Sequence, residues 1–254
     1  MAHRPGSLAA YVLHRYDWSE SSLILDLFTR EQGRLAVAAK GAKRPYSQLR
    51  PVLLPFQRVN VSFGRAVAAD DAPDVLTLRG AEWAGGAPMP GGAALFSGFY
   101  LNELLMKLLA RHDPHPVLFD AYAATLPALD GAEEDVQAAL RAFELVLLRE
   151  VGLLPELGVL TSSLSPVQPQ QPYALRPEGG VVPGLDAEPV VTGQTLAQCQ
   201  AALDSGRLDV LRLACRPAIG PLRAMLRTLL YYHLGSPHPL RTRSVMVDVQ
   251  RMLE

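Results

Sequence analysis

Few side chains of this 254-residue sequence have the types and spacing that catalysis or metal binding requires. The closest histidine pair is His112 and His115, and no cysteine stands near it to complete a set of three or four metal ligands. The acids Asp70, Asp71 and Asp74 surround an Ala-Pro dipeptide, which is typical of a hairpin turn. The alternative is a nuclease or phosphoesterase that uses the histidine pair together with these acids. Such an enzyme would require the fold to bring together two elements that are separate in the sequence. We therefore predict no catalytic residues, no bound metal or other cofactor, and a protein that is not an enzyme.

The cysteine content and the apolar segments bear on the cellular compartment. Cys199 and Cys215 are too few for a disulfide scaffold and are predicted to be buried thiols in a reducing environment. The first residues lack the apolar core of a signal peptide, and no uninterrupted apolar stretch reaches the roughly 18 residues of a membrane span. We expect a soluble, cytoplasmic protein with no membrane partner.

Charge is segregated along the chain although the formal net charge is only −1. Residues 30–65 contain eight basic residues and one acid, a net charge of +7, and residues 207–254 carry +5. Residues 112–156 between them carry −7. Such asymmetry favours a polyanionic partner for the two basic segments, and solvated surfaces that happen to share a sign are the alternative.

The first basic segment combines cations with aromatic residues, which is the combination that single-stranded nucleic acids require. The residues predicted to bind DNA are Arg30, Arg34, Lys40, Lys43, Arg44 and Arg50 for phosphates and Tyr46 for base stacking. Trp18 is a further aromatic candidate, whereas Phe28 and Phe63 lie within apolar segments and are expected in the core. A second basic surface is predicted near the C-terminus from Arg223, Arg227, Arg241 and Arg243.

The elements that must position these side chains change in type along the chain. Strand character is found in five segments, at 8–13, 23–29, 35–40, 52–63 and 75–78. Five short strands in about 70 residues fit a small closed barrel, and the OB-fold, a barrel that often binds oligonucleotides, has this size. Glycines and prolines then predict a linker at 81–92.

After the linker the apolar period becomes helical. Helices are predicted at 95–110, 117–129, 133–151, 194–204, 217–233 and 243–253. Residues 155–193 contain seven prolines and are predicted to form turns with room for a small hairpin. The predicted fold is α+β and multidomain: an OB-fold β-barrel at 1–80, the linker, a helical bundle from 93–154 and 194–254, and an inserted module at 155–193.

Two segments resemble the N-terminal domain of the RecO family of bacterial recombination mediators. They are Glu20–Leu35 and Ala39–Ser47, the latter reading Ala-Lys-Gly-Ala-Lys-Arg-Pro-Tyr-Ser. Later segments are similar to the family in the same order, at Tyr100–Leu105, Asp113–Asp120, Leu140–Leu148, Gly152–Pro155, His233–Gly235 and Leu240–Ser244. The resemblance therefore covers nearly the whole chain.

This resemblance implies a fold and a set of partners. It implies an OB-fold followed by a helical domain, binding to single- and double-stranded DNA, and annealing of complementary strands. It also implies that the protein, together with RecR, promotes loading of RecA onto DNA covered by single-strand-binding protein (SSB), with RecF as an indirect partner, in the cytoplasm at the nucleoid. The second basic surface would contact either DNA or the acidic tail of SSB. The alternative is an OB-fold adaptor that binds RecR and SSB but has little DNA affinity of its own.

The sequence departs from the family pattern at the inserted module. Many members carry a Cys-x-x-Cys…Cys-x-x-Cys zinc site there, whereas the stretch from Leu157 to Gly184 contains no cysteine. Without thiolates such a site cannot hold zinc. We expect a zinc-ribbon-like module that lacks its cysteines and its metal and is held by packing alone.

Overall fold

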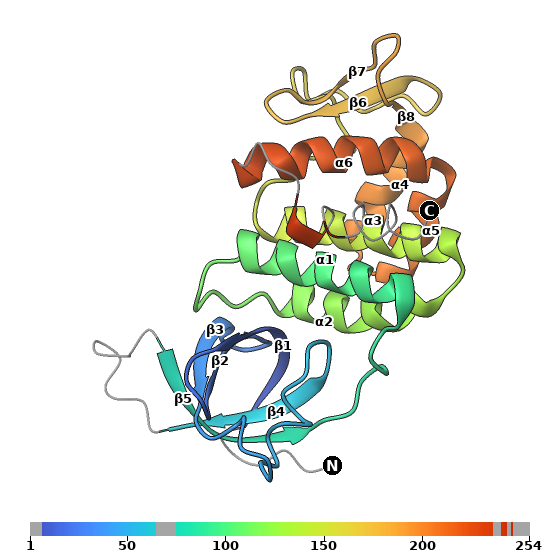
Figure 1. Ribbon diagram of the computed structural model, residues 1–254. Helices are drawn as coiled ribbons and strands as arrows, with labels where there is room; N and C mark the ends of the chain where they lie inside the picture. The colour runs from blue at the N-terminus through green and yellow to red at the C-terminus, as the bar shows by residue number, and fades with distance from the viewer. Residues whose placement is uncertain (1–6, 65–74, 236–239, 243–244, 246–254) are drawn as a thin grey trace. The chain divides into compact units, whose positions relative to one another are not determined.

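The computed structural model describes residues 7–64, 75–235, 240–242 and 245. The described chain divides into two compact units, a barrel unit that ends at Pro127 and a helical unit that begins at Ala128 (Figure 1). The prediction that residues 243–253 form a helix falls almost wholly outside the described residues, and so do Asp70, Asp71 and Asp74. In the described part of the chain, no helix has the length and apolar character needed to span a membrane.

The barrel unit contains a closed five-stranded barrel, which confirms the predicted OB-fold. Its strand order is β1-β2-β3-β5-β4, with β1 also paired to β4, and every pairing is antiparallel except that of β3 with β5. The strands are β1 (Leu8–Asp17), β2 (Leu23–Thr29), β3 (Gly33–Ala39), β4 (Arg58–Phe63) and β5 (Val75–Trp83).

Alternation along these strands sends one set of apolar side chains into the barrel. Val12, Leu25, Leu27 and Val37 belong to this core and are fully buried. A β-bulge between Val12 and His14 shifts the register of β1, so that Arg15 lies opposite Leu25 and Asp17 lies opposite Leu23. Residues directly opposite one another share a face of an antiparallel pair. The bulge therefore turns two charged residues toward the inside of the barrel at its open end.

The connection from β3 to β4 is a chain of turns over residues 40–57, not the strand from residue 52 that the sequence predicted. Strand β4 begins only at Arg58, because Pro51 and Pro55 cannot donate ladder hydrogen bonds and Phe56 takes a positive φ of 68°. The ring of Phe56 is buried and packs against Phe99, with ring centroids 5.0 Å apart.

The first two helices pack on the outer face of the barrel and belong to its unit. They are α1 (Gly92–Leu108) and α2 (Pro116–Thr125), and a 3₁₀ turn, η2 (Leu126–Asp130), follows them. Tyr11 of β1 contacts Phe119 and Tyr122 of α2, with ring centroids 5.3 and 5.0 Å apart. The Asn102 amide of α1 donates to the carbonyl of Leu13 at 2.9 Å. Because of these contacts, residues 93–127 belong to the barrel unit, whereas the predicted domain boundaries assigned them to the helical bundle.

The predicted linker also begins later than expected. Strand β5 continues through Trp83 because Ala81 and Trp83 pair with Val61 and Val59 of β4. The glycines that break the pattern follow at Gly85 and Gly86, both with positive φ. Residues 84–91 alone connect the barrel to α1.

The helical unit is built around α3 (Glu133–Glu150), whose predicted apolar stripe is buried at Val136, Leu140, Phe143 and Leu147. Its other elements are α4 (Gly193–Asp204), α5 (Leu208–Cys215), the 3₁₀ turn η3 (Arg216–Ala218) and α6 (Ile219–Leu234). Helix α5 was not predicted from the sequence; it has only eight residues and follows a turn at Gly206 with φ of 66°.

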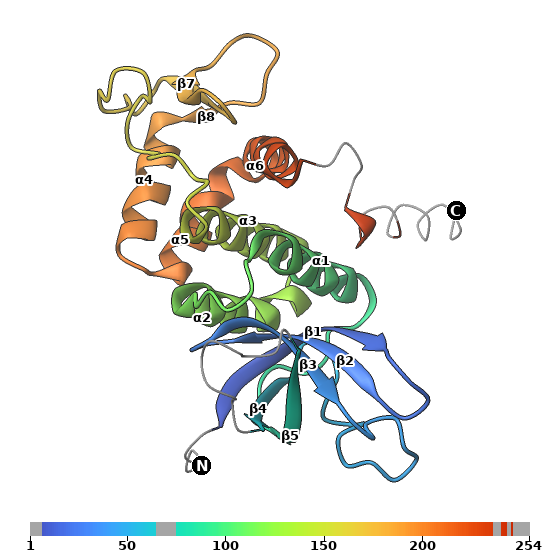
Figure 2. The same ribbon diagram turned by 90° about the vertical axis from the view of Figure 1, so that its left-hand side faces the viewer.

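The inserted module forms a small antiparallel sheet of order β7-β6-β8. Its strands are β6 (Pro172–Arg176), β7 (Gly180–Pro183) and β8 (Val191–Thr192). Tyr173, Leu175 and Val181 are buried, and the Leu175 amide donates to the sulfur of Met225 on α6. The predicted hairpin is therefore present as β6 and β7, and apolar packing attaches it to the helices. Figure 2 shows this sheet beside α4 and α6 of its own unit.

Candidate nucleic-acid interface

Two loops meet at the open end of the barrel, and backbone hydrogen bonds join them. They are the β1–β2 loop (residues 18–22) and the β3–β4 loop (residues 40–57). The Lys43 amide donates to the carbonyl of Ser21 at 3.0 Å, and the Lys43 ammonium donates to the carbonyl of Ser19 at 3.0 Å. Gly41 has φ of 73°, a left-handed conformation that glycine adopts without strain, and it turns the chain from β3 into the loop.

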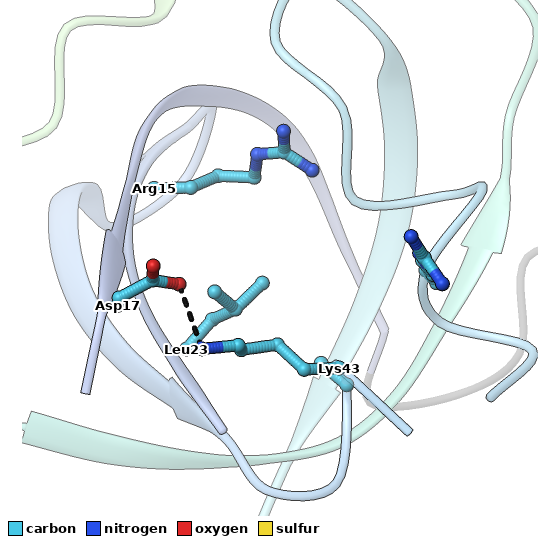
Figure 3. A pocket seen from close by; sticks show the side chains of 6 residues that line it. Arg15, Asp17, Leu23 and Lys43 are labelled. Carbon is cyan, nitrogen blue, oxygen red and sulfur yellow. Dashed lines mark ion pairs between the residues drawn. The ribbon is translucent and has the colours of Figure 1, made fainter. Parts of the chain in front are cut away.

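A pocket of about 430 Å³ opens between these loops and the end of β1 (Figure 3). Its lining residues are Arg15, Asp17, Leu23, Ala42, Lys43 and Arg50. Arg15 and Asp17 come from β1 beyond the bulge and extend toward the opening, across from Lys43. The Asp17 carboxylate and the Lys43 ammonium form an ion pair at 3.1 Å.

Further cations and aromatic rings are exposed around this pocket. Lys40, Arg44 and Arg50 are exposed and form no ion pair with any residue that the structure describes. Tyr46 is 95% exposed, and Trp18 of the β1–β2 loop is 57% exposed. We define the basic mouth as the five cations Arg15, Lys40, Lys43, Arg44 and Arg50. Four of the seven residues predicted to bind DNA thus belong to the basic mouth, and Tyr46 lies in the same loop.

The structure places Arg30 and Arg34 elsewhere, in contacts with the helices. Arg30 forms two hydrogen bonds with the carboxylate of Asp120 on α2, at 3.0 and 2.8 Å, and this pairing raises the pKa of Arg30. The side chain of Arg34 is only 15% exposed and is paired with Asp26 at 3.0 Å. Both cations hold α1 or α2 against the barrel, so neither belongs to the basic mouth.

Helices also cover the barrel face on which OB-folds commonly bind oligonucleotides. That face is formed by strands 2 and 3. Its outward residues Asp26, Phe28, Ala36 and Ala38 are buried, and the ring of Phe28 packs against Phe119 of α2. These residues of β2 and β3 therefore present little exposed surface to a ligand.

The structure describes three of the four arginines of the second predicted basic surface. Arg223 and Arg227 are exposed one turn apart on α6, and neither forms an ion pair with a described residue. Arg241 is exposed, and Arg243 lies outside the described residues. Arg216, which precedes them, is paired with Asp135 of α3.

Arg15 and Asp17 line the pocket but were not among the residues predicted to bind DNA. Both lie in β1, where simple alternation from Val12 places them on the outer face. The bulge reverses their direction. The charge of the segment Arg15-Tyr16-Asp17 at the end of an apolar strand was the available signal.

The histidine pair and the two cysteines lie in surroundings that do not indicate a metal site or a reactive thiol among the described residues. The imidazole of His115 lies 3.4 Å from the carboxylate of Asp113, and no group of three or more metal-ligating side chains is found among the described residues. Cys199 and Cys215 are buried, and the hydrogen bond between the two thiols together with burial raises the pKa of the Cys215 thiol. That thiol is therefore held in its unreactive, protonated form.

Two family models match this chain, the N-terminal part of recombination protein O over residues 6–68 and its C-terminal part over residues 91–242. The chain belongs to the RecO family. The DNA repair protein RecO of a Polaromonas species is 52% identical over 256 residues, covering 98% of each chain. The DNA repair protein RecO of Verminephrobacter eiseniae is 50% identical over 254 residues, covering 99% of each chain. The family resemblance noted from the motifs is thereby confirmed, together with its OB-fold.

Proposed function

We propose that this protein is a recombination mediator in DNA repair, which binds DNA through the basic mouth and catalyses no reaction itself. Membership of the RecO family supports the role in DNA repair. The observation that carries the DNA-binding surface is the gathering of five cations around one barrel end, three of which are exposed without an ion pair to a described residue.

The arrangement suits both single and double strands of DNA. Lysine and arginine side chains bind phosphates and release the counterions condensed on them, without reading the base sequence. Tyr46 and Trp18 are exposed enough to stack on unpaired bases, as aromatic residues do in single-strand-binding OB-folds. Backbone contacts of this kind leave the base edges open for pairing and reduce the repulsion between two strands, which is what annealing requires.

The same proposal assigns partners by analogy with the family. The protein would act with RecR to load RecA onto single strands that carry SSB, with RecF as an indirect partner, in the cytoplasm at the nucleoid. Arg223 and Arg227 on α6 are a surface for either DNA or the acidic tail of SSB. We propose further that no zinc or other cofactor takes part, since the inserted module has no cysteine.

Fluorescence anisotropy of the full chain with a labelled single strand of 30 nucleotides, titrated across salt concentration, tests DNA binding. Each neutralised phosphate adds about 0.7 to the slope of log affinity against log salt concentration for a single strand. We expect a slope of several units, and we expect the double variant Lys43→Glu/Arg44→Glu to reduce both affinity and slope. Arg30→Gln is the matched control, because it removes a cation from the same segment outside the basic mouth.

A different outcome would replace the proposal with the adaptor function. Weak DNA binding with a flat slope, combined with tight binding of purified RecR, would show that this chain reaches DNA only through its partner. Unchanged affinity in Lys43→Glu/Arg44→Glu would exclude the β3–β4 loop as the DNA-binding surface.

A further inference from the structure

We propose that the pocket at the barrel end receives one unpaired nucleotide of a DNA strand, so that the protein holds single strands more tightly than duplex DNA. The inference rests on the proposed DNA-binding function and adds to it a specific subsite with a specific preference. The lining of the pocket combines two apolar residues, three cations and one carboxylate, and a nucleotide has a base and phosphates that can contact all three kinds of group.

The lining contains apolar residues that suit a base and cations that suit its phosphates. Leu23 and Ala42 are the apolar residues of the lining, against which a base can place its ring. Arg15, Lys43 and Arg50 bring positive charge to the same lining, so that phosphates can be neutralised there. The volume of 430 Å³ lies within the range of about 300–1,000 Å³ found for small-molecule sites.

Asp17 gives the pocket a hydrogen-bond acceptor among its cations. Its carboxylate is 79% exposed and shares the Lys43 ammonium with the carbonyl of Ser19. An acidic side chain of this kind repels phosphate but accepts hydrogen bonds from the amino groups of bases. Its position therefore favours a base edge over a second phosphate on the β1 side of the pocket.

The pocket is held open by contacts within the barrel unit. The Arg15 guanidinium donates to the carbonyl of Leu53 at 3.2 Å, which fixes its direction. The backbone hydrogen bond from Lys43 to Ser21 holds the two loops at a constant separation. A preformed site loses little conformational entropy when it binds a ligand. Its contacts with the ligand therefore contribute more fully to the binding free energy.

The preference for single strands follows from the state of the base. A base in a duplex is paired and stacked, and extracting it costs a few kcal/mol, whereas an unpaired base costs much less. Cations outside the pocket, such as Arg44, meet phosphates that both forms of DNA present. Loss of a pocket cation should therefore weaken single-strand binding more than duplex binding, while loss of Arg44 should weaken both alike.

The experiment compares Arg15→Gln and Arg50→Gln with the control Arg44→Gln, all in the full chain. Dissociation constants are measured at one salt concentration for a 30-nucleotide single strand and for the blunt duplex of the same sequence. We expect each pocket variant to lose about tenfold in single-strand affinity, the typical value of a hydrogen bond to a charged group, and clearly less in duplex affinity. The control should lose the same factor on both DNAs.

A second readout follows the base directly. 2-Aminopurine within the single strand becomes brighter when it leaves the base stack, so its emission should rise on binding to the wild-type protein and to Arg44→Gln, and rise less with the pocket variants. Urea unfolding verifies that Arg15→Gln is folded, and Arg50→Gln tests the pocket without removing the bond to Leu53.

The outcomes separate the two proposals. Equal losses on both DNAs in the pocket variants, with no change in the 2-aminopurine signal, would overturn the nucleotide pocket and leave DNA binding by the basic mouth intact. Absence of DNA binding by the wild-type chain would overturn both.

Discussion

Arg34 and Asp26 form an ion pair of 3.0 Å on the outer face of β2 and β3, at the point where α1 ends. The guanidinium also donates to the carbonyl of Met106 in the last turn of α1 and to that of Leu109, the residue that follows the helix. Asp26 is only 4% exposed, so Arg34 supplies the compensating charge for a buried carboxylate. One side chain thus neutralises a barrel residue and caps the helix that covers it.

Replacing Arg34 should therefore destabilise the fold. We expect Arg34→Leu to lower the free energy of unfolding by about 3–5 kcal/mol, because a buried carboxylate and two helix-terminal carbonyls lose their partner. Urea unfolding followed by circular dichroism measures it. Arg30→Leu is the control, since its pair with Asp120 is exposed to solvent and should change the unfolding midpoint far less. Equal effects of the two substitutions would contradict this role for Arg34.

The contrast between these arginines shows what charge counting can and cannot predict. The run of cations between Arg30 and Arg50 indicated a basic surface, and the turn-rich segment Lys40–Arg50 forms it, since its cations have no acidic neighbours in sequence. Arg30 and Arg34 stand in the same run, but their partners Asp120 and Asp26 belong to another element or the opposing strand. The fold was predictable because strand and helix periods are local, whereas the bulge in β1 and the docking of α1 and α2 depend on tertiary contacts.

Asp17→Asn should strengthen DNA binding. The substitution removes one negative charge from the pocket and releases Lys43 from its ion pair, so that the ammonium can contact a phosphate. We expect higher affinity for a single strand and an increase of about 0.7 in the salt slope, measured by anisotropy. Glu20 is an exposed carboxylate of the adjacent β1–β2 loop that does not line the pocket, so Glu20→Gln should have a smaller effect. A lower affinity of Asp17→Asn would mean that the carboxylate contributes more to binding through its hydrogen bond to a base than Lys43 gains by contacting a phosphate.

Gly33→Ala should be strongly destabilising. Gly33 has φ of 67°, and a Cβ at this position would overlap the backbone carbonyl of Asp113, where the chain comes close enough for the His112 amide to donate to the carbonyl of Arg34 at 3.0 Å. We expect a loss of about 3 kcal/mol or more, from strain and from displaced backbone together. Gly85→Ala has similar strain at φ of 84° but meets no atom within 4 Å, so about 1–2 kcal/mol is expected. Thermal unfolding of the two variants would compare these effects.

Stability should fall at alkaline pH through Tyr122. Burial raises the pKa of Tyr122 well above its ordinary value of about 10, and its hydroxyl donates to Asn102 Oδ1 at 2.6 Å. Above pH 10 the unfolded chain loses this proton while the folded chain keeps it, so the free energy of unfolding decreases by about 1.4 kcal/mol per pH unit until the folded pKa is reached. In Tyr122→Phe the slope of the unfolding free energy against pH should be smaller, by the contribution of one proton. Urea unfolding between pH 8 and pH 11 measures the difference, and identical slopes would contradict it.

Chelators should leave the protein unchanged. The inserted module has no cysteine between Leu157 and Gly184, and Tyr173, Leu175 and Val181 pack in its interior. We expect no zinc by elemental analysis of the purified chain, and the same thermal midpoint and DNA affinity with and without EDTA. Leu175→Ala should instead loosen the module by removing buried apolar surface, at a cost of about 2–5 kcal/mol. A stoichiometric metal that EDTA removes with loss of stability would contradict the proposal.

Closure of the barrel also restricts how partners can attach. Each of its five strands has a neighbour on both sides, so the barrel offers no free strand edge to which another chain could add by main-chain hydrogen bonds. Among the described residues, unpaired sheet edges remain only at β7 and β8 of the inserted module. Association by strand addition would therefore take place on the helical unit, while the barrel unit must recognise its ligands through side chains and loops.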